Sequence, residues 1–514
     1  MSAKAGVSRD ILGPSPRIGA RTAKATGGAP TVHLAILCRT LSFVTAVVTA
    51  FQFLPMIWSI HDAASDLNPF IAALGVGSAI SGLLFIAGRE ANPRDMGLRE
   101  AFAMVTLAWV CASVVGALPY WISGTLPTYT DAFFEAMSGF STTGATVLVH
   151  IEGTPRGILF WRSLTQWLGG MGIIVLSLAV LPMLGMGGMA LFKAEIPGPV
   201  PEKLTPRVQH SALLLWGIYV LLTAAQTGAL LAGGLSFFDA LTHSLSTVAT
   251  GGFSPLNQSV GHYQNAYVEW VIAFFMFFSG ASFPLHYRFL MGRGPVHWRD
   301  PEFRLYAGIT VGATAVVTVS LLSSKVCDGF AEALRYAAFQ VVSIFTSTGF
   351  ATANYIHWPG VTHFIFLILM FVGGCAGSTG GGMKTIRVLL VWRQARSELM
   401  HLVHPRGVFP VRVGGVSMRN STVATVTAFF TLYVGLFALS ALALTGLGMG
   451  ILDAASGAAA CLGNVGPGLG SLGPMDNYAG VPFLGKWILC FDMLLGRLEI
   501  YPVLLVFLRG AWRG

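Results

Sequence analysis

The chain has 514 residues, of which 54% are hydrophobic and only 10% are charged. Soluble domains carry about 25% charged residues, so this composition excludes an ordinary soluble protein and indicates that most of the chain lies in lipid. The net charge of +9 does not indicate nucleic-acid binding, because the basic residues are scattered over several short loops.

Ten apolar runs each reach or approach the ~20 residues that cross a hydrocarbon core, and they predict an all-α integral membrane protein. The first run is too long for a signal-peptide core, and no small-residue cleavage site follows it, so we expect it to be retained. A basic tail, residues 1–31, precedes it. The predicted spans are Leu34–Ile60, Phe70–Ala87, Ala101–Ile122, Ile158–Met183, Ser211–Leu235, Val268–Met291, Leu305–Leu322, Phe364–Val391, Thr422–Leu447 and Trp487–Leu508.

Lysine and arginine orient these spans. With the N-terminus inside, 25 of the 31 basic residues lie on one side of the membrane. The positive-inside rule therefore predicts that both termini are cytoplasmic. After the cytoplasmic tail we expect two leading transmembrane helices and four pore units, over residues 32–100, 101–192, 211–292, 303–397 and 420–514.

Four segments repeat one pattern: a span, an acidic residue, a short amphipathic stretch, a glycine loop and a second span. The acid precedes the loop glycine by 13, 12, 17 and 13 residues. The pairs are Asp131 with Gly144, Asp239 with Gly251, Glu332 with Gly349, and Asp453 with Gly466. Because these stretches are too short to span and too apolar for a free loop, we interpret them as re-entrant half-helices whose N-termini the acids cap.

Each half-helix is expected to direct the negative end of its dipole toward the membrane centre, where a cation would lie. The loop after it leaves carbonyls without helical partners, and four converging sets of carbonyls can replace a cation's hydration shell. The alternative is ordinary loops with turn glycines, in a chain of 62 glycines. That alternative does not explain four loops at near-equal spacing, so the sequence predicts a cation pore.

At these loops the chain resembles the Trk/Ktr/HKT superfamily of potassium transporters, from about residue 35 to the C-terminus. Other motifs carry the resemblance: Trp161–Gly172, Leu191–Pro199, Lys203–Arg207, Ser347–Phe350, Gly373–Lys384 and Gly496–Ile500. The superfamily has two leading helices and four helix–loop–helix units around a central pore, as counted above. The resemblance implies potassium uptake across a bacterial inner membrane.

The resemblance also implies which residues form the selectivity filter and bind K⁺. They are Thr142, Thr143, Gly144, Ala249, Thr250, Gly251, Ser347, Thr348, Gly349, Asn464, Val465 and Gly466. Members with Ser at the first filter glycine tend toward sodium, so Gly144 favours potassium. Asn464 and Val465 depart from the Ser/Thr chemistry of the first and third loops. They leave a sodium-permeable or sodium-coupled transporter as the alternative, and symport with a proton is left open.

Six glycines interrupt the apolar run from Phe364 to Val391. The predicted gating residues here are Gly373, Gly374, Gly377, Ser378, Gly380, Gly381, Gly382 and Lys384. Such a glycine run unwinds a helix at membrane depth, although close helix packing through small residues is the alternative. The resemblance implies a flexible constriction beneath the filter, an intramembrane gating loop.

Arg497 lies midway along the last apolar run, where a charge costs about 3 kcal/mol and is usually functional or paired. A structural ion pair is one explanation, but the i,i+2 spacing makes Glu499 an unsuitable partner. The resemblance implies that the matching arginine faces the pore beneath the filter. We hypothesise that Arg497 is an electrostatic barrier that movement of the gating loop relieves.

The sequence contains no catalytic motif, so we expect neither an enzyme nor a covalent cofactor. Gly468–Gly473 matches a dinucleotide fingerprint but lacks a βαβ context. The resemblance implies a homodimer that docks on a cytosolic TrkA-type ring, whose subunits would bind ATP, ADP or NAD. The basic loop Lys384–Arg419 is a candidate docking surface, or it holds the topology and contacts anionic membrane lipids.

Acidic residues on the outer side are expected to raise the local cation concentration at the pore entrance. These are Asp62, Asp66, Asp131, Glu135, Asp239 and Asp476.

Overall fold

The computed structural model describes residues 34–92, 96, 98–172, 208–292 and 294–508. The predicted basic tail, the predicted span beyond residue 172, and the motifs Leu191–Pro199 and Lys203–Arg207 lie outside the described residues.

Most of the described residues fold into helices and very few lie in strands, which confirms the all-α class. The helices of the first half are α1 (Leu34–Phe51), α2 (Phe53–His61), α3 (Leu67–Ala87), α4 (Leu98–Gly116), α5 (Leu118–Ile122), α6 (Tyr129–Phe140), α7 (Arg156–Gly170), α10 (Val208–Ala232), α11 (Phe237–Val248), α12 (Ala266–Ser279), α13 (Phe283–Leu290) and α14 (Val296–Arg299). Those of the second half are α15 (Pro301–Ser323), α16 (Phe330–Phe345), α17 (Gly360–Phe371), α18 (Thr385–Val403), α19 (Asn420–Gly446), α20 (Ile451–Leu462), α21 (Phe483–Arg497) and α22 (Tyr501–Phe507).

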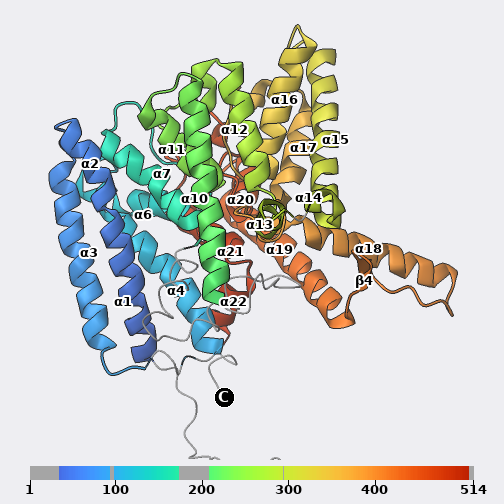
Figure 1. Ribbon diagram of the computed structural model, residues 1–514, viewed down its shortest axis with the longest axis horizontal. Coiled ribbons are helices and arrows are strands. Elements are labelled where there is room, and N and C mark those ends of the chain that lie inside the picture. Colours follow the sequence, from blue (N-terminus) through green and yellow to red (C-terminus); the bar gives the residue numbers. More distant parts are fainter. Residues whose placement is uncertain (1–33, 93–95, 97, 173–207, 293, 509–514) are drawn as a thin grey trace, which may run out of the picture.

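The strands among the described residues form two short ladders. β1 (Val372–Gly373) pairs in parallel with β2 (Met383–Lys384), and β3 (Arg412–Val413) pairs antiparallel with β4 (Val416–Ser417). Figure 1 shows α18 and the β3–β4 hairpin projecting from the body of the molecule.

Six helical stretches in the described part of the chain are long and apolar enough to cross a membrane, or seven if the bent pair α12–α13 is one span. The six are Leu34–His61, Leu67–Ala87, Glu100–Ile122, Ala212–Ala232, Pro301–Ser323 and Asn420–Gly446. The first two pack together at one edge of the molecule (Figure 1). There the Ser81 hydroxyl donates to the Thr45 hydroxyl at 2.9 Å.

Four units follow the leading helices, each with a long helix, a short helix and a second helix. The long helices are α4, α10, α15 and α19, the short helices are α6, α11, α16 and α20, and the second helices are α7, α12, α17 and α21. The short helices have 12 to 16 residues, fewer than the ~20 that cross a hydrocarbon core. Every residue of α6 from Asp131 to Phe140 is buried, so this helix lies inside the protein.

Two of the second helices end in breaks that the apolar runs did not predict. The span predicted over Val268–Met291 is not one straight helix, because α12 and α13 meet at 99° across Gly280–Ser282. The span predicted over Trp487–Leu508 breaks at Glu499 and Ile500, both at positive φ. In the first case Gly280 ends α12, and the next helix has a proline in its first turn. In the second case the charged residue Glu499 comes shortly before Pro502. Both arrangements end a helix locally.

The acids near the start of the short helices do not cap them as predicted. The capping oxygens belong to Thr128 and Ser236, which accept from the backbone N–H of Asp131 and Asp239 at 3.1 Å each. The acids lie three residues further on, where the hydroxyls of Thr128 and Ser236 donate to their carboxylates at 2.7 and 2.8 Å. A carboxylate in the first turn still interacts favourably with the positive end of the helix dipole.

Candidate functional site

All four short helices end in the same way, with a Schellman motif. In α6 the Thr143 N–H donates to the Ser138 carbonyl at 2.9 Å and the Thr142 N–H to the Gly139 carbonyl at 3.0 Å. The corresponding long bonds elsewhere are Gly251 N–H to Ser246, Thr348 N–H to Ser343, and Val465 N–H to Ala460, each at 2.8 Å. The repeat found in the sequence is therefore a repeat of backbone hydrogen bonding.

The residue at the turn of each motif has a left-handed backbone although it is not glycine. These residues are Thr142 (φ 54°), Thr250 (54°), Ser347 (57°) and Asn464 (52°). A left-handed conformation costs a non-glycine residue roughly 1–2 kcal/mol. Backbone strain at the same position of all four units is typical of a functional site, where a particular side chain is retained although its backbone conformation is unfavourable.

The glycine two residues later also has positive φ, and it identifies the equivalent positions. These glycines are Gly144 (φ 84°), Gly252 (81°), Gly349 (85°) and Gly466 (94°). The predicted register of the second loop is therefore one residue off: the counterpart of Gly144 is Gly252. Gly251 is the counterpart of Thr143, and Ala249 is the C-cap of α11. Gly252 lies 13 residues after Asp239, the same spacing as in the first and fourth units, and this equal spacing was the available sequence signal.

These four glycines form a closed ring with their neighbours' carbonyls. A Cβ on Gly144 would collide with the Gly251 carbonyl, and one on Gly252 with the Thr348 carbonyl. Likewise a Cβ on Gly349 would collide with the Val465 carbonyl, and one on Gly466 with the Thr143 carbonyl. Each unit thus contacts the next and the fourth contacts the first, and only glycine permits this approach.

The carbonyls of the left-handed residues are available for a ligand. Among the described residues no hydrogen bond ends on the carbonyl of Thr142, Thr250, Ser347 or Asn464. Buried carbonyls normally have a donor, and oxygen atoms at the C-terminal ends of four helices favour a cation.

A cavity of about 330 Å³ lies on one side of the ring. One glycine from each unit lines it: Gly144, Gly252, Gly349 and Gly466. Polar groups of the segments that follow the loops, including Asn257, Asp476 and Asn477, also line it. The ring of loops is therefore open to this cavity.

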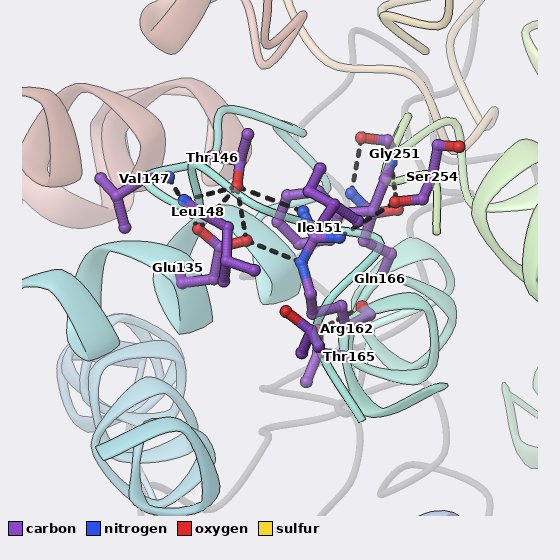
Figure 2. Close-up of polar contacts among 12 residues, drawn as sticks. Glu135, Thr146, Val147, Leu148, Ile151, Arg162, Thr165, Gln166, Gly251 and Ser254 are labelled. Atoms are coloured by element: carbon purple, nitrogen blue, oxygen red, sulfur yellow. Dashed lines mark hydrogen bonds and ion pairs between the residues drawn. The ribbon is translucent and has the colours of Figure 1, made fainter. Parts of the chain in front are cut away.

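Arg162 ties the first loop to the second beside this cavity (Figure 2). Its Nε bonds to Glu135 of α6 at 2.8 Å, its Nη1 to the Ser254 carbonyl at 3.0 Å and its Nη2 to the Thr146 hydroxyl at 3.2 Å. The other Glu135 oxygen accepts from the Val147 N–H at 2.9 Å. Both charged side chains are fully buried, so the pair is a structural brace.

Gln166, one turn along α7, clamps the second loop at two points (Figure 2). Its Nε2 donates to the Gly251 carbonyl at 2.6 Å, and its Oε1 accepts from the Phe253 N–H at 3.0 Å. Neither Arg162 nor Gln166 was among the predicted site residues, although both lie in the Trp161–Gly172 motif. The motif was therefore the one sequence signal noted above that could have indicated these two residues.

Two of the acids predicted to attract cations are neutralised. Glu135 pairs with Arg162, and Asp131 accepts from Lys486 Nζ at 2.6 Å. The structure therefore corrects the prediction for these two residues, because a buried ion pair presents no net charge to the entrance. Asp476 lies at the cavity and is exposed.

The glycine-rich segment lies directly on the other side of the ring. The β1–β2 pair joins Val372 to Met383 and Gly373 to Lys384, and so forms a neck. Glu302, at the start of α15, holds both sides of that neck: its Oε1 accepts from the Ala376 N–H at 2.7 Å and the Ile386 N–H at 3.0 Å. This buried acid was not predicted as a site residue, and nothing local in the sequence indicates it.

Arg497 connects the fourth unit to the ring and to the glycine-rich segment. Its Nη1 donates to the Thr142 hydroxyl at 3.1 Å and to the Thr379 carbonyl at 2.8 Å. Its Nη2 donates to the carbonyls of Gly169 and Gly170 at the end of α7. A guanidinium, with five donors in a rigid fork, suits such a multiple contact.

Glu499 bonds to Arg387 of α18. Lys384 Nζ donates to the Gly380 carbonyl within the glycine-rich segment. Of the predicted gating residues, Gly380, Gly381 and Arg497 lie next to the ring, whereas Gly377 contacts the break between α12 and α13 through its carbonyl and the Phe283 N–H at 2.9 Å.

Four short helices that end in one carbonyl ring, among a set of long apolar helices, define a multi-pass membrane transport protein. A family model described as a cation transport protein, TrkH, matches residues 70–510. The chain therefore belongs to the TrkH family, which confirms the family resemblance seen in the motifs.

The Trk system potassium uptake protein TrkH of Salmonella typhimurium is 40% identical over 94% of this chain and 100% of its own length. TrkG of Escherichia coli K12, also named a Trk system potassium uptake protein, is 34% identical over 94% of this chain and 99% of its own. The crystal structure of the potassium transporter TrkH from Vibrio parahaemolyticus superposes with a TM-score of 0.84, at 36% identity, over 94% and 100% of the two chains.

Proposed function

We propose that this chain takes up potassium across the bacterial inner membrane through the ring formed by the four loops. The single observation that carries the proposal is the closed ring of Gly144, Gly252, Gly349 and Gly466 against neighbouring carbonyls. Backbone carbonyls in such a ring can replace the hydration shell of a monovalent cation. Relatives over nearly the whole chain are named potassium uptake proteins.

The filter comprises the predicted triplets with Gly252 added to the second loop. The glycine-rich segment from Gly373 to Lys384 acts as the gate, and Arg497 holds it against the ring. The segment Lys384–Arg419, which includes α18, carries seven basic residues, so by the positive-inside rule we assign this segment and both termini to the cytoplasmic side. The membrane potential, worth about 2.3 kcal/mol per charge per 100 mV, would then drive inward flux.

Regulation comes from outside the chain in this proposal. A homodimer docks on a cytosolic ring of TrkA-type subunits that bind ATP, ADP or NAD. The projecting α18 and β3–β4 hairpin, with Trp392 and Leu402 exposed, offer a surface for such docking.

The test is cation flux into proteoliposomes that contain the full chain, with potassium compared with sodium. Wild type should prefer potassium, and Gly144→Ser should lose that preference, because its Cβ would meet the Gly251 carbonyl. Gly153→Ser is the matched control, since no atom lies within 4 Å of a Cβ there. Equal selectivity of Gly144→Ser and wild type would contradict a filter at this ring. A wild type that prefers sodium would favour the alternative, a sodium-permeable member of the family.

A further inference from the structure

Two buried histidines meet beside the break between α12 and α13. His286 Nδ1 and His297 Nε2 lie 3.0 Å apart, and His286 Nε2 lies 2.9 Å from the Phe278 carbonyl oxygen. Only 7% of His286 and 8% of His297 is exposed. The two side chains therefore connect α12, α13 and α14 through a row of hydrogen bonds.

The partners of His286 fix which nitrogen atoms carry hydrogen. A carbonyl oxygen only accepts, so His286 Nε2 carries a hydrogen and donates it to Phe278. In the neutral ring Nδ1 is then an acceptor, and His297 Nε2 donates to it. A proton added to His286 Nδ1 would set two donors face to face, so the row in this form requires a neutral His286.

The break that the histidines brace is also a seat for the glycine-rich segment. The Gly280 carbonyl accepts from the Cys375 N–H at 2.8 Å, and the Phe283 N–H donates to the Gly377 carbonyl at 2.9 Å. Both contacts use backbone groups within the break or at the start of α13. A change in the angle between α12 and α13 would therefore disturb them.

The second histidine belongs to the element that leads to the neck. His297 lies in α14, which is followed directly by α15 and by Glu302, the acceptor for both sides of the neck. The His286–His297 bond thus fixes the contacts at the break relative to the contacts at the neck. The sequence separates these two histidines by a short basic loop, and no motif indicates the pair.

The surroundings of the pair oppose a positive charge. Phe283 packs on His286 and Phe303 on His297, with ring centroids 5.5 and 5.2 Å apart. Burial lowers the pKa of His297, and Asp300 offsets part of this effect. The neighbouring elements carry further titratable or charged side chains: Tyr219 of α10, Arg288 of α13, Arg299 of α14, Asp300 and Glu302 of α15, and Cys375 and Lys384 of the glycine-rich segment.

We propose that His286 and His297 are positioning residues for the gate, and that their hydrogen bond keeps the gate seated while both rings are uncharged. Protonation of the pair frees α13 from α14, loosens the break and releases the gate. This inference rests on the proposed function and adds to it a response of the gate to protons.

The direction of the response follows from the two environments of the rings. In the released form the rings meet water, where histidine has a pKa of about 6.5. In the seated form burial holds the pKa of His297 below that value. Lowering the pH below about 6.5 therefore favours the released form, and well above that pH both forms are neutral and the equilibrium no longer changes.

The test is potassium flux into proteoliposomes that contain the full chain, with the same pH on both sides and no partner subunit. For one titrating ring, flux should rise by up to about tenfold between pH 7.5 and pH 5.5. Flux independent of pH in a conducting wild type would overturn the role of the histidines alone. A wild type without potassium flux at either pH would overturn the proposed function and this inference with it.

Two substitutions of His297 separate a proton-sensitive clamp from simple packing. His297→Gln keeps an N–H donor for His286 but cannot take up a proton, so it should keep the low flux of wild type at the higher pH and respond less to acid. His297→Leu removes the donor and should give high flux at both pH values. Wild-type flux and pH response in His297→Leu would overturn the proposal.

The matched control is His363→Gln, since His363 of α17 also bonds a backbone carbonyl, that of Tyr355, at 2.8 Å. This variant should retain both the flux and the pH response of wild type. His297→Gln with the full wild-type pH response would refute the proposal even if the leucine variant did not fold.

Discussion

A Cβ on Gly466 would lie 2.5 Å from the carbonyl oxygen of Thr143, so the fourth loop closes the ring against the first. These two residues are more than 300 positions apart in the chain. The contact shows that the four units form a complete ring and that its geometry depends on the absence of a side chain at each junction.

Gly466→Ala should therefore lower the potassium-to-sodium permeability ratio. The new Cβ collides with a backbone carbonyl, and its left-handed φ of 94° adds about 1–2 kcal/mol of strain. Reversal potentials in reconstituted bilayers measure the effect. Gly480→Ala, with no neighbour within 4 Å, is the control. A Gly466→Ala protein with wild-type selectivity would show that this junction does not shape the ion path.

Gln166→Leu should disorder the second loop by removing both points of its clamp. The Gly251 carbonyl and the Phe253 N–H lose their partners, and an unsatisfied buried group costs about 1–3 kcal/mol. We expect lower thermal stability in detergent and a lower permeability ratio. Gln394→Leu, on the projecting α18, should change neither. Loss of stability without any change in selectivity would limit Gln166 to a structural role.

Breaking the Arg162–Glu135 brace should destabilise the protein strongly. Removal of one partner leaves the other charge buried, a loss of about 3–5 kcal/mol. Arg162→Met and Glu135→Met should each lower the unfolding temperature, and the double variant should recover part of the loss. Unfolding in detergent, arranged as a double-mutant cycle, measures the coupling. Additive effects of the two changes would contradict a direct brace.

Glu302→Ala should release the neck of the gate, because the Ala376 and Ile386 N–H groups lose their shared acceptor. We expect higher potassium leak in the absence of any partner subunit. Glu302→Gln keeps an oxygen at the same place and should stay near wild type. Glu398→Ala, on α18, is the control for loss of an acid. Equal leak in Glu302→Ala and wild type would mean that other contacts hold the neck.

Arg497→Ala should raise basal potassium flux, because the charge beneath the ring and its bond to the Thr379 carbonyl are both lost. Removal of a barrier of 1.4 kcal/mol raises a rate about tenfold. Arg497→Lys retains the positive charge but loses the several N–H donors of the guanidinium. Its potassium flux should therefore lie between the fluxes of wild type and Arg497→Ala. Proteoliposome uptake measures all three. Unchanged flux and unchanged response to a nucleotide-binding partner in Arg497→Ala would refute the barrier.

The sequence alone determined the membrane location, the all-α class and the presence of four equivalent loops. These properties depend on local composition and on spacing along the chain: apolar runs of spanning length and glycines a fixed distance beyond a short amphipathic helix. The same local information identified Arg497 as unusual, because a charge in an apolar run is costly wherever its partners lie.

Tertiary structure decided the rest. Between Gly251 and Gly252 the register depends on which glycine meets the Thr348 carbonyl, a contact with another unit nearly a hundred residues away. The roles of Glu302 and Gln166 likewise come from backbone groups that the fold brings to them. Apolar composition did not show that α12–α13 and α21–α22 would break. Hydropathy reports the free energy of transfer to lipid and carries no information about the direction of the chain. Long-range contacts close the ring, form the Arg162–Glu135 brace and position the glycine-rich segment. Only the packed molecule specifies these contacts.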